Sequence, residues 1–295
     1  MTFFLGQAYT ESSMKFTKTL LYCKHMDIRK SDGTVQPFTG EKLESALTRA
    51  HVSASAISEV LSTIPRMIRP GTSTQQIHAR VMHVLESIDP VGAARFNLKH
   101  SMFQLGPSGF PFEHYLARLL TAYGWETEVG KMVLGKCVEH EVDVYAKREG
   151  EIRAIEAKYR NTAGGRVEIK VALYVHARHL DLCARDPSVE GALFTNTQLT
   201  DTARIYSECV NMKVMAWNYP ANEGIAKFIE QKGLYPVTVF SRIPFHVISK
   251  LTRDGIVLAN QLCELNVSQL NKYGLRQEDI LNLQDNSRKL CALHL

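Results

Sequence analysis

The most constraining feature of the sequence is a pair of strand-like runs, VEHEVDVYAK and IRAIEAKY, joined by a short Glu-Gly turn. Both runs alternate apolar and polar residues, the pattern of half-buried strands on either side of a hairpin. The antiparallel register set by the turn places Asp143 directly opposite Glu156, and Glu141 opposite Lys158. Because side chains alternate along a strand, all four charged groups are expected on one face of the hairpin.

The opposite face of the same hairpin reads as an ordinary core surface. It is expected to carry small and branched apolar side chains: Val142, Val144, Ala146, Ile155 and Ala157. The charged face is different, because two carboxylates directly opposed across strands repel each other, and burial strengthens the repulsion. A positive charge is therefore expected between Asp143 and Glu156.

Two kinds of cation satisfy this requirement. Lys158 supplies part of the charge, but Mg²⁺ and Mn²⁺ prefer hard oxygen ligands and match a carboxylate pair better. A lysine beside such a metal orients or deprotonates an attacking water, while the metal stabilises charge on a phosphate. The alternative is a solvated face without a function, which by spacing alone is the commoner arrangement.

The surrounding segments favour an α/β layer with a mixed sheet. The Gly-, Pro- and Ser-containing stretch LGPSGFP marks a domain boundary, and a helix over FEHYLARLLTAYGW follows it with Phe112, Leu116 and Leu119 on one stripe and Glu113 beside them. After the hairpin come a helix near VEIKVALYVHARHLDLC, a strand at GALFTNT, a helix near LTDTARIYSEC and a strand at KVMAWNYP. A hairpin followed by alternating strands and helices is typical of such a layer.

This order of a helix with Glu113, a strand with Asp143 and a strand with Glu156 and Lys158 resembles the PD-(D/E)xK restriction endonuclease-like superfamily. The similarity is greatest to Mrr-like type IV restriction enzymes and archaeal Holliday-junction resolvases, and LFTNTQLTDTARIYSE resembles a further Mrr-like pattern. The resemblance implies a catalytic site of Glu113, Asp143, Glu156 and Lys158. It also implies that Asp143, Glu156 and Glu113 bind Mg²⁺ or Mn²⁺.

The first part of the chain resembles a second family. The stretches DIRKSDGTVQPFTGEKLESAL, GTSTQQIHARVMHVL and GAARFNLKHSM are similar to the ATP-cone domain, a nucleotide-binding regulatory module. The resemblance implies that Lys30, Lys42 and Thr74 bind ATP or dATP. Lysines neutralise phosphates, and Thr74 lies near a helix N-terminus, where backbone donors favour anions.

These segments divide the chain into four parts. We expect an N-terminal extension at 1–25, an ATP-cone domain at 26–105, a nuclease-like α/β domain at 106–240 and a C-terminal helical module at 241–295. The module has Leu, Ile and Val at helical spacing with intervening glycines, which indicates four or five short helices. It is expected to serve packing or dimerisation, with binding of nucleic acid backbone as the less favoured alternative.

Composition limits the possible environments without deciding the function. The formal charge of +5 is compatible with a polyanionic partner, and 45% hydrophobic with 22% charged residues is ordinary for a globular chain. The six cysteines contain no Cys-x-x-Cys pair, so neither zinc nor a disulfide framework is indicated. No run is long enough to span a bilayer, and a cytoplasmic location without membrane contact is expected.

The sequence therefore predicts a multi-domain α/β protein that hydrolyses DNA with the help of Mg²⁺ or Mn²⁺, under control of bound ATP or dATP. Its expected partners are DNA, adenine nucleotide and further copies of itself in a dimer or higher oligomer. One alternative is a nucleotide-sensing DNA-binding regulator with an inactive nuclease fold. Retention of Asp143, Glu156 and Lys158 together argues against that alternative. A scaffold protein is a third possibility.

Overall fold

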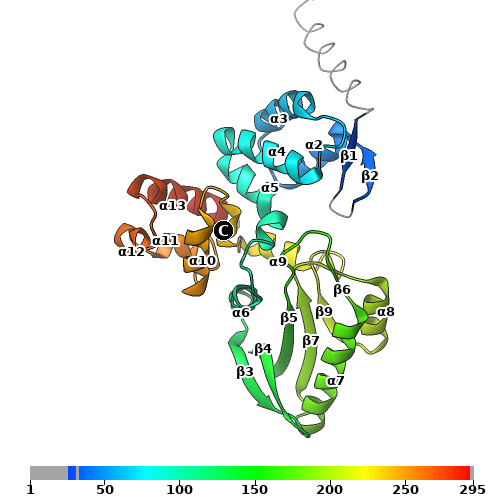
Figure 1. Cartoon of the computed structure of the whole chain (residues 1–295). Helices are drawn as coiled ribbons and strands as arrows, with labels where there is room; N and C mark the ends of the chain where they lie inside the picture. The colour runs from blue at the N-terminus through cyan, green and yellow to red at the C-terminus, as the bar shows by residue number, and fades with distance from the viewer. Residues whose placement is uncertain (1–25, 31–32, 293–295) are drawn as a thin grey trace, which may run out of the picture. The chain divides into compact units, whose positions relative to one another are not determined.

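The computed structural model describes residues 26–30 and 33–292, which form two compact units that divide after Asn97 (Figure 1). Each unit is described by itself. The expected extension at 1–25 lies outside the described residues.

The first unit is a small hairpin followed by helices. Its strands are β1 (Asp27–Arg29) and β2 (Val35–Pro37), and its helices are α2 (Gly40–Arg49), α3 (Ala54–Met67), α4 (Thr74–Ile88) and the start of α5 (Pro90–Met102). The apolar stripes of the helices meet in one core that includes Leu47, Val60, Ile64, Val81 and Leu85, all without solvent exposure. The expected helical domain is thus confirmed.

The second unit is built on a five-stranded mixed sheet in the order β3-β4-β5-β7-β9. The strands are β3 (Glu126–Leu134), β4 (Glu139–Arg148), β5 (Glu151–Lys158), β7 (Val189–Thr195) and β9 (Lys213–Met215). β3, β4 and β5 pair antiparallel, whereas β7 pairs parallel with β5 and with β9. The mixed sheet confirms the predicted fold class, but β3 was not predicted.

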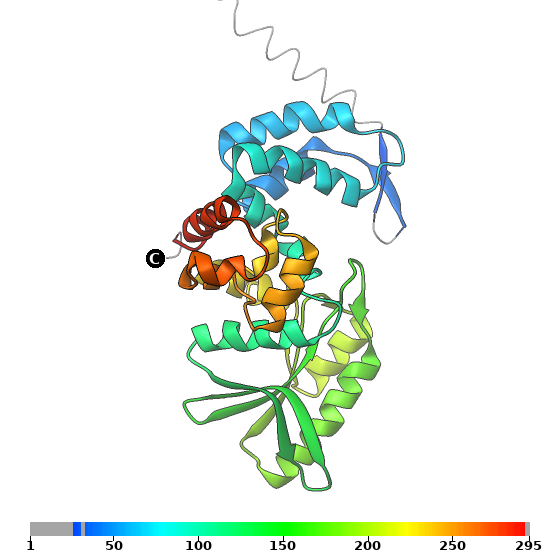
Figure 2. The ribbon, with the colours of Figure 1, turned by 60° about the vertical axis from the view of Figure 1, so that its left-hand side comes forward.

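Helices pack against this sheet (Figures 1 and 2). α6 (Phe110–Ala122) packs against β3 and β4, and α7 (Ile169–Arg185) packs against β7. α8 (Asp201–Cys209) packs against α7, and α9 (Ile225–Lys232) contacts α6. A short parallel pair, β6 (Arg166–Val167) and β8 (Gln198–Leu199), lies beside the main sheet.

The chain ends in a group of short helices, as the sequence predicts. A 3₁₀ turn (η1, Val237–Val239) leads into α10 (Phe245–Arg253), α11 (Gln261–Glu264), α12 (Val267–Asn271) and α13 (Gln277–Cys291). The buried Gln284 amide donates to the Leu262 and Leu265 carbonyls, at 2.8 and 2.7 Å, and so joins α13 to the α11 segment. The Tyr115 hydroxyl on α6 donates to the Leu234 carbonyl at 2.7 Å, which fixes the segment that enters this group.

Candidate functional site

Strands β4 and β5 separate at the two predicted carboxylates. Their ladder runs from Arg148↔Glu151 to Val144↔Ile155, in the predicted register. Beyond this pair β4 stays paired with β3 and β5 stays paired with β7. We call this point the fork. Asp143 and Glu156 are the first residues past it.

The fork corrects one detail of the prediction. Asp143 and Glu156 are not a ladder pair, and Glu141 is not paired with Lys158, because the strands have already diverged. The Asp143 carboxylate fills the gap: its Oδ2 accepts a hydrogen bond from the Ala157 backbone N–H at 2.7 Å. A side-chain oxygen thus satisfies a buried backbone donor of the neighbouring strand.

On its other side, Asp143 lies opposite a glycine. Val129 of β3 pairs with Val144 of β4, and Lys131 pairs with Val142. Gly130 lies between these two pairs and has φ +64°. That left-handed conformation suits glycine and introduces a local twist beside Asp143. The five residues predicted for the core face of the hairpin are all buried.

The four predicted site residues come together at the fork. Glu113, Asp143, Glu156 and Lys158 all line one pocket of about 380 Å³, which we call the site pocket. The other residues that line it are Pro107, Ser108, Gly109, Ala157, Tyr159, Arg160 and Asn161. Side chains from a helix and from two strands thus converge on one cavity.

The helix residue Glu113 reaches the pocket from the first turn of α6. Pro111 is compatible with that turn, where its missing N–H breaks no helical hydrogen bond. A Cβ on Gly109 would lie 3.3 Å from the Glu113 Oε1, so the absence of a side chain there leaves room for the carboxylate.

A residue that sequence reasoning missed supplies a charged partner at the fork. Arg178 on α7 is only 4% exposed, and its Nη2 donates to Glu156 Oε2 at 2.9 Å. Its Nη1 donates to the Glu141 backbone carbonyl at 3.0 Å. Arg178 shares the buried face of α7 with Ala172, Val175 and Leu182. A charged residue on an apolar helical stripe is the signal that could have identified it.

The pocket holds more negative charge than this one guanidinium compensates. Burial raises the pKa of Glu113 to about 7, and the charges of Asp143, Glu141 and Glu156 act in the same direction. Burial and the Glu156 charge also raise the pKa of Asp143, against the opposing effects of the Ala157 N–H and Arg178. Titratable groups shifted in this way are typical of functional sites, although structural clusters show such shifts too.

The carboxylates do not form a preassembled metal cage. Among residues 26–30 and 33–292, no three or more His, Cys, Asp or Glu side chains are grouped closely enough to hold a metal ion. Asp143 is engaged by the Ala157 N–H and Glu156 by Arg178. The expected metal ligands Asp143, Glu156 and Glu113 therefore share a pocket without converging on one point.

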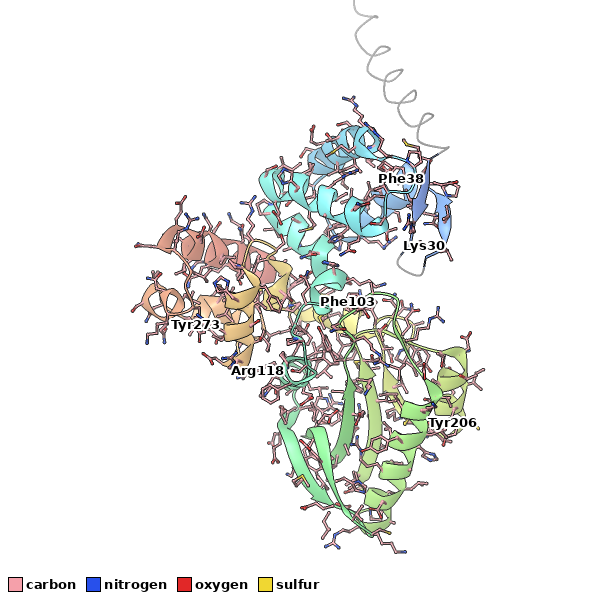
Figure 3. All side chains as sticks on the ribbon, viewed as in Figure 1. Lys30, Phe38, Phe103, Arg118, Tyr206 and Tyr273 are labelled. Carbon is pink, nitrogen blue, oxygen red and sulfur yellow. The ribbon has the colours of Figure 1, made fainter. Side chains whose placement is uncertain are left out.

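In the first unit, two of the three residues expected to bind nucleotide, Lys30 and Thr74, lie at the end of β1 and at the start of α4. The Arg29 N–H donates to the Thr72 carbonyl at 3.1 Å and Gly71 N–H to the Asp27 carbonyl at 2.9 Å, so β1 runs beside the start of α4. Arg29 also forms a parallel bridge with Ser73, so Lys30 lies near Thr74, the first residue of α4. Lys42 is exposed in the first turn of α2. Figure 3 labels Lys30 at the end of β1.

The C-terminal module offers fewer free cations than its sequence suggests. Arg276 forms two hydrogen bonds with Asp279, at 2.8 and 3.2 Å, and Lys289 pairs with Asp285 at 2.6 Å. These pairs lower the positive potential that a DNA backbone would meet. Within the described part of the chain, no helix is long and apolar enough to cross a membrane.

Comparison with known proteins adds two family matches. A model of the ATP-cone domain matches residues 26–104, and a model described as AF1548-like, C-terminal, matches residues 235–291. The chain is 39% identical over 160 residues to an uncharacterised protein of Archaeoglobus fulgidus, covering 54% of this chain and 90% of that protein. The crystal structure of AF1548, a protein of unknown function, is 34% identical with a TM-score of 0.54, over 63% of this chain and 99% of that one.

The ion pair between Arg178 and Glu156 gives a first prediction. Arg178→Met should lower the free energy of unfolding by about 3 kcal/mol, because it leaves the partly buried Glu156 unpaired beside Asp143. Adding Glu156→Gln should restore most of this loss. Both are measured by urea unfolding. Arg204→Met, which removes an exposed helical ion pair, is the matched control and should have little effect. An Arg178→Met variant as stable as the wild type would show that the pair does not hold the fork.

The raised pKa of Glu113 gives a second prediction. The folded protein binds the Glu113 proton more tightly than the unfolded chain, in which the glutamate has a pKa of 4.5. Protonation of Glu113 therefore contributes fully to the free energy of unfolding below pH 4.5. This contribution disappears as the pH rises past about 7. Glu113→Gln should therefore be more stable than the wild type at pH 8, by about 1 kcal/mol after allowance for solvent screening.

The comparison is made by urea unfolding from pH 4 to pH 8. Glu264→Gln, in the C-terminal module, is the control and should follow the wild-type profile. Parallel profiles for Glu113→Gln and the wild type would contradict the assignment of the shifted group.

Proposed function

The chain belongs to the AF1548-like family and carries an ATP-cone domain. We propose that it is a metal-dependent DNA endonuclease modulated by ATP or dATP. One observation carries the proposal. The four residues singled out by resemblance to the PD-(D/E)xK superfamily line a single pocket at the fork, although they are distributed over residues 113–158. A solvated face without a function does not require the helix residue Glu113 to join the strand residues.

The donor set suits a hard divalent cation. Asp143 and Glu156, with Glu113 beside them, offer carboxylate oxygens, and a cation would compensate their combined negative charge. We infer that Asp143 and Glu156 would hold Mg²⁺ or Mn²⁺, with Glu113 as the third carboxylate, after a bound cation draws together side chains that do not converge in its absence. When bound, the cation stabilises negative charge on the phosphate.

The other groups of the pocket then act on the substrate. Lys158 forms no ion pair within the described residues, so its ammonium can donate to a water or to a phosphate oxygen. Water adds to phosphorus, its proton leaves to a base, and the bond to the departing oxygen breaks as that oxygen gains a proton.

A second function is favoured by the contact at Arg178. Its guanidinium already compensates Glu156, one of the inferred metal ligands. With Glu156 paired to Arg178 and not to a metal ion, a phosphate held by Lys158 and Arg160 would be bound without being cleaved. In that case the protein would be a nucleotide-sensing DNA-binding regulator. Cleavage assays separate the two functions.

The third prediction tests the nuclease. With Mg²⁺ or Mn²⁺, the protein should nick plasmid DNA, and Asp143→Asn and Lys158→Ala should each reduce the rate at least about 100-fold by removing charge stabilisation. DNA binding, measured by gel shift, should persist in both variants. Lys147→Ala and Glu151→Gln, on the same two strands away from the pocket, are matched controls and should cleave normally. DNA binding by the wild type without nicking would support the regulator instead.

The fourth prediction concerns the nucleotide. ATP or dATP should bind residues 26–104 and raise the melting temperature by mass action. Lys42→Ala should weaken binding roughly tenfold, as expected for loss of one charged hydrogen bond of about 1.5 kcal/mol. Calorimetry on the full chain measures this, with Arg49→Ala at the other end of α2 as control. Equal affinities of wild type and Lys42→Ala would remove Lys42 from the site.

A further inference from the structure

A second and larger pocket adjoins the site pocket. Its volume is about 550 Å³, and Pro107 and Asn161 line both cavities. The two pockets are therefore neighbours that share a wall. We call the second one the aromatic pocket.

Three phenylalanines shape the aromatic pocket. Phe103 follows α5 and is labelled in Figure 3, Phe240 follows the 3₁₀ turn η1, and Phe245 is the first residue of α10. Phe240 is 9% exposed and belongs to the packed interior, whereas Phe245 is 65% exposed. An aromatic side chain so exposed at the edge of a cavity has a ring face free for a ligand.

Buried polar contacts hold the walls in place. The Thr238 hydroxyl donates to the Ser101 carbonyl at 2.9 Å, which joins η1 to the end of α5. The fully buried Asn196 accepts from the Arg160 N–H at 2.9 Å and donates to the Arg160 carbonyl at 2.7 Å. Asn196 thereby fixes the segment that carries Asn161 into the shared wall. The cavity is part of the folded framework of the second unit.

The two pockets have complementary chemistry. No residue that lines the aromatic pocket carries a charge, and its polar groups include Gln104, Asn161 and Ser241. Amides and hydroxyls form hydrogen bonds with base edges, and phenylalanine rings stack on bases. The site pocket next to it has Lys158 and Arg160, which attract phosphate, beside the three carboxylates that the proposed function assigns to a divalent cation. An uncharged aromatic cavity beside a charged one matches the two halves of a nucleotide.

We propose that the aromatic pocket receives an unstacked nucleobase of a DNA strand whose phosphate lies in the site pocket. This proposal rests on the proposed function, since it takes the strand to be bound at the fork. It gives the segment at 237–248 a role in substrate recognition: the preferred DNA has an unpaired base, because a base already out of the stack enters the cavity without the cost of unpairing.

The fifth prediction follows from this preference. Three synthetic duplexes are compared by fluorescence anisotropy with Ca²⁺ in place of Mg²⁺: one fully paired, one with a single unpaired adenosine, and one with an abasic residue at the unpaired position. The wild type should bind the unpaired adenosine about tenfold more tightly than the abasic duplex, the gain expected from stacking one base on an aromatic ring. Equal affinity for these two duplexes would overturn the proposal.

Two variants locate the preference. Phe245→Ala and Gln104→Ala should each reduce the difference between the adenosine and abasic duplexes while leaving affinity for paired DNA unchanged. Phe110→Ala is the matched control, because Phe110 is also an exposed phenylalanine, at 49%, but does not line the aromatic pocket. It should keep the wild-type preference. Preference retained in Phe245→Ala and Gln104→Ala would place the base elsewhere and refute the proposal.

A plasmid-nicking assay run in parallel separates this proposal from the nuclease function. Nicking without preference for the unpaired base would refute the aromatic pocket alone. Preference for the unpaired base without nicking would support base binding in the aromatic pocket and would show that the protein binds DNA without cleaving it. Absence of binding to all three duplexes would refute both.

Discussion

Electrostatic repulsion at the fork is the constraint on which the arrangement of the second unit depends. Asp143 and Glu156 follow directly on a regular antiparallel ladder, and the ladder ends where they begin. The Asp143 carboxylate accepts a hydrogen bond from the Ala157 N–H, and Glu156 pairs with the Arg178 guanidinium of α7. Each carboxylate has one stabilising partner, while burial, with the nearby carboxylate charges, raises the pKa of Glu113. The site pocket lies at the fork, where β4 and β5 no longer pair.

Much of the fold and of the site could be predicted from the sequence, because the hairpin and the helices depend on patterns of neighbouring residues. The hairpin register follows from alternation on both sides of the Glu-Gly turn, and the helix of Glu113 follows from one apolar stripe. The same local rules predicted the helices of the first unit and the short helices at the end of the chain. The resemblance to two families then directed attention to seven residues, of which Glu113, Asp143, Glu156 and Lys158 line one pocket.

The parts that sequence reasoning missed depend on contacts between distant segments. β3 contains polar residues and a glycine, and its pairing with β4 gives it a strand conformation that its own composition does not demand. Arg178 is one of several basic residues in α7, and only the packing of that helix makes it the partner of Glu156. The aromatic pocket combines residues 103–107 with 238–248, so no local motif reveals it.

The parallel pairing of β5 with β7 also bears on the order in which the chain folds. The β4–β5 hairpin joins neighbours in the chain and closes a short loop, whereas β7 returns to β5 only after the whole of α7. Local contacts form before such crossovers, because closing the longer loop costs more conformational entropy. During that interval Asp143 and Glu156 have no guanidinium near them. The charge balance of the pocket is therefore completed only when α7 docks against the sheet.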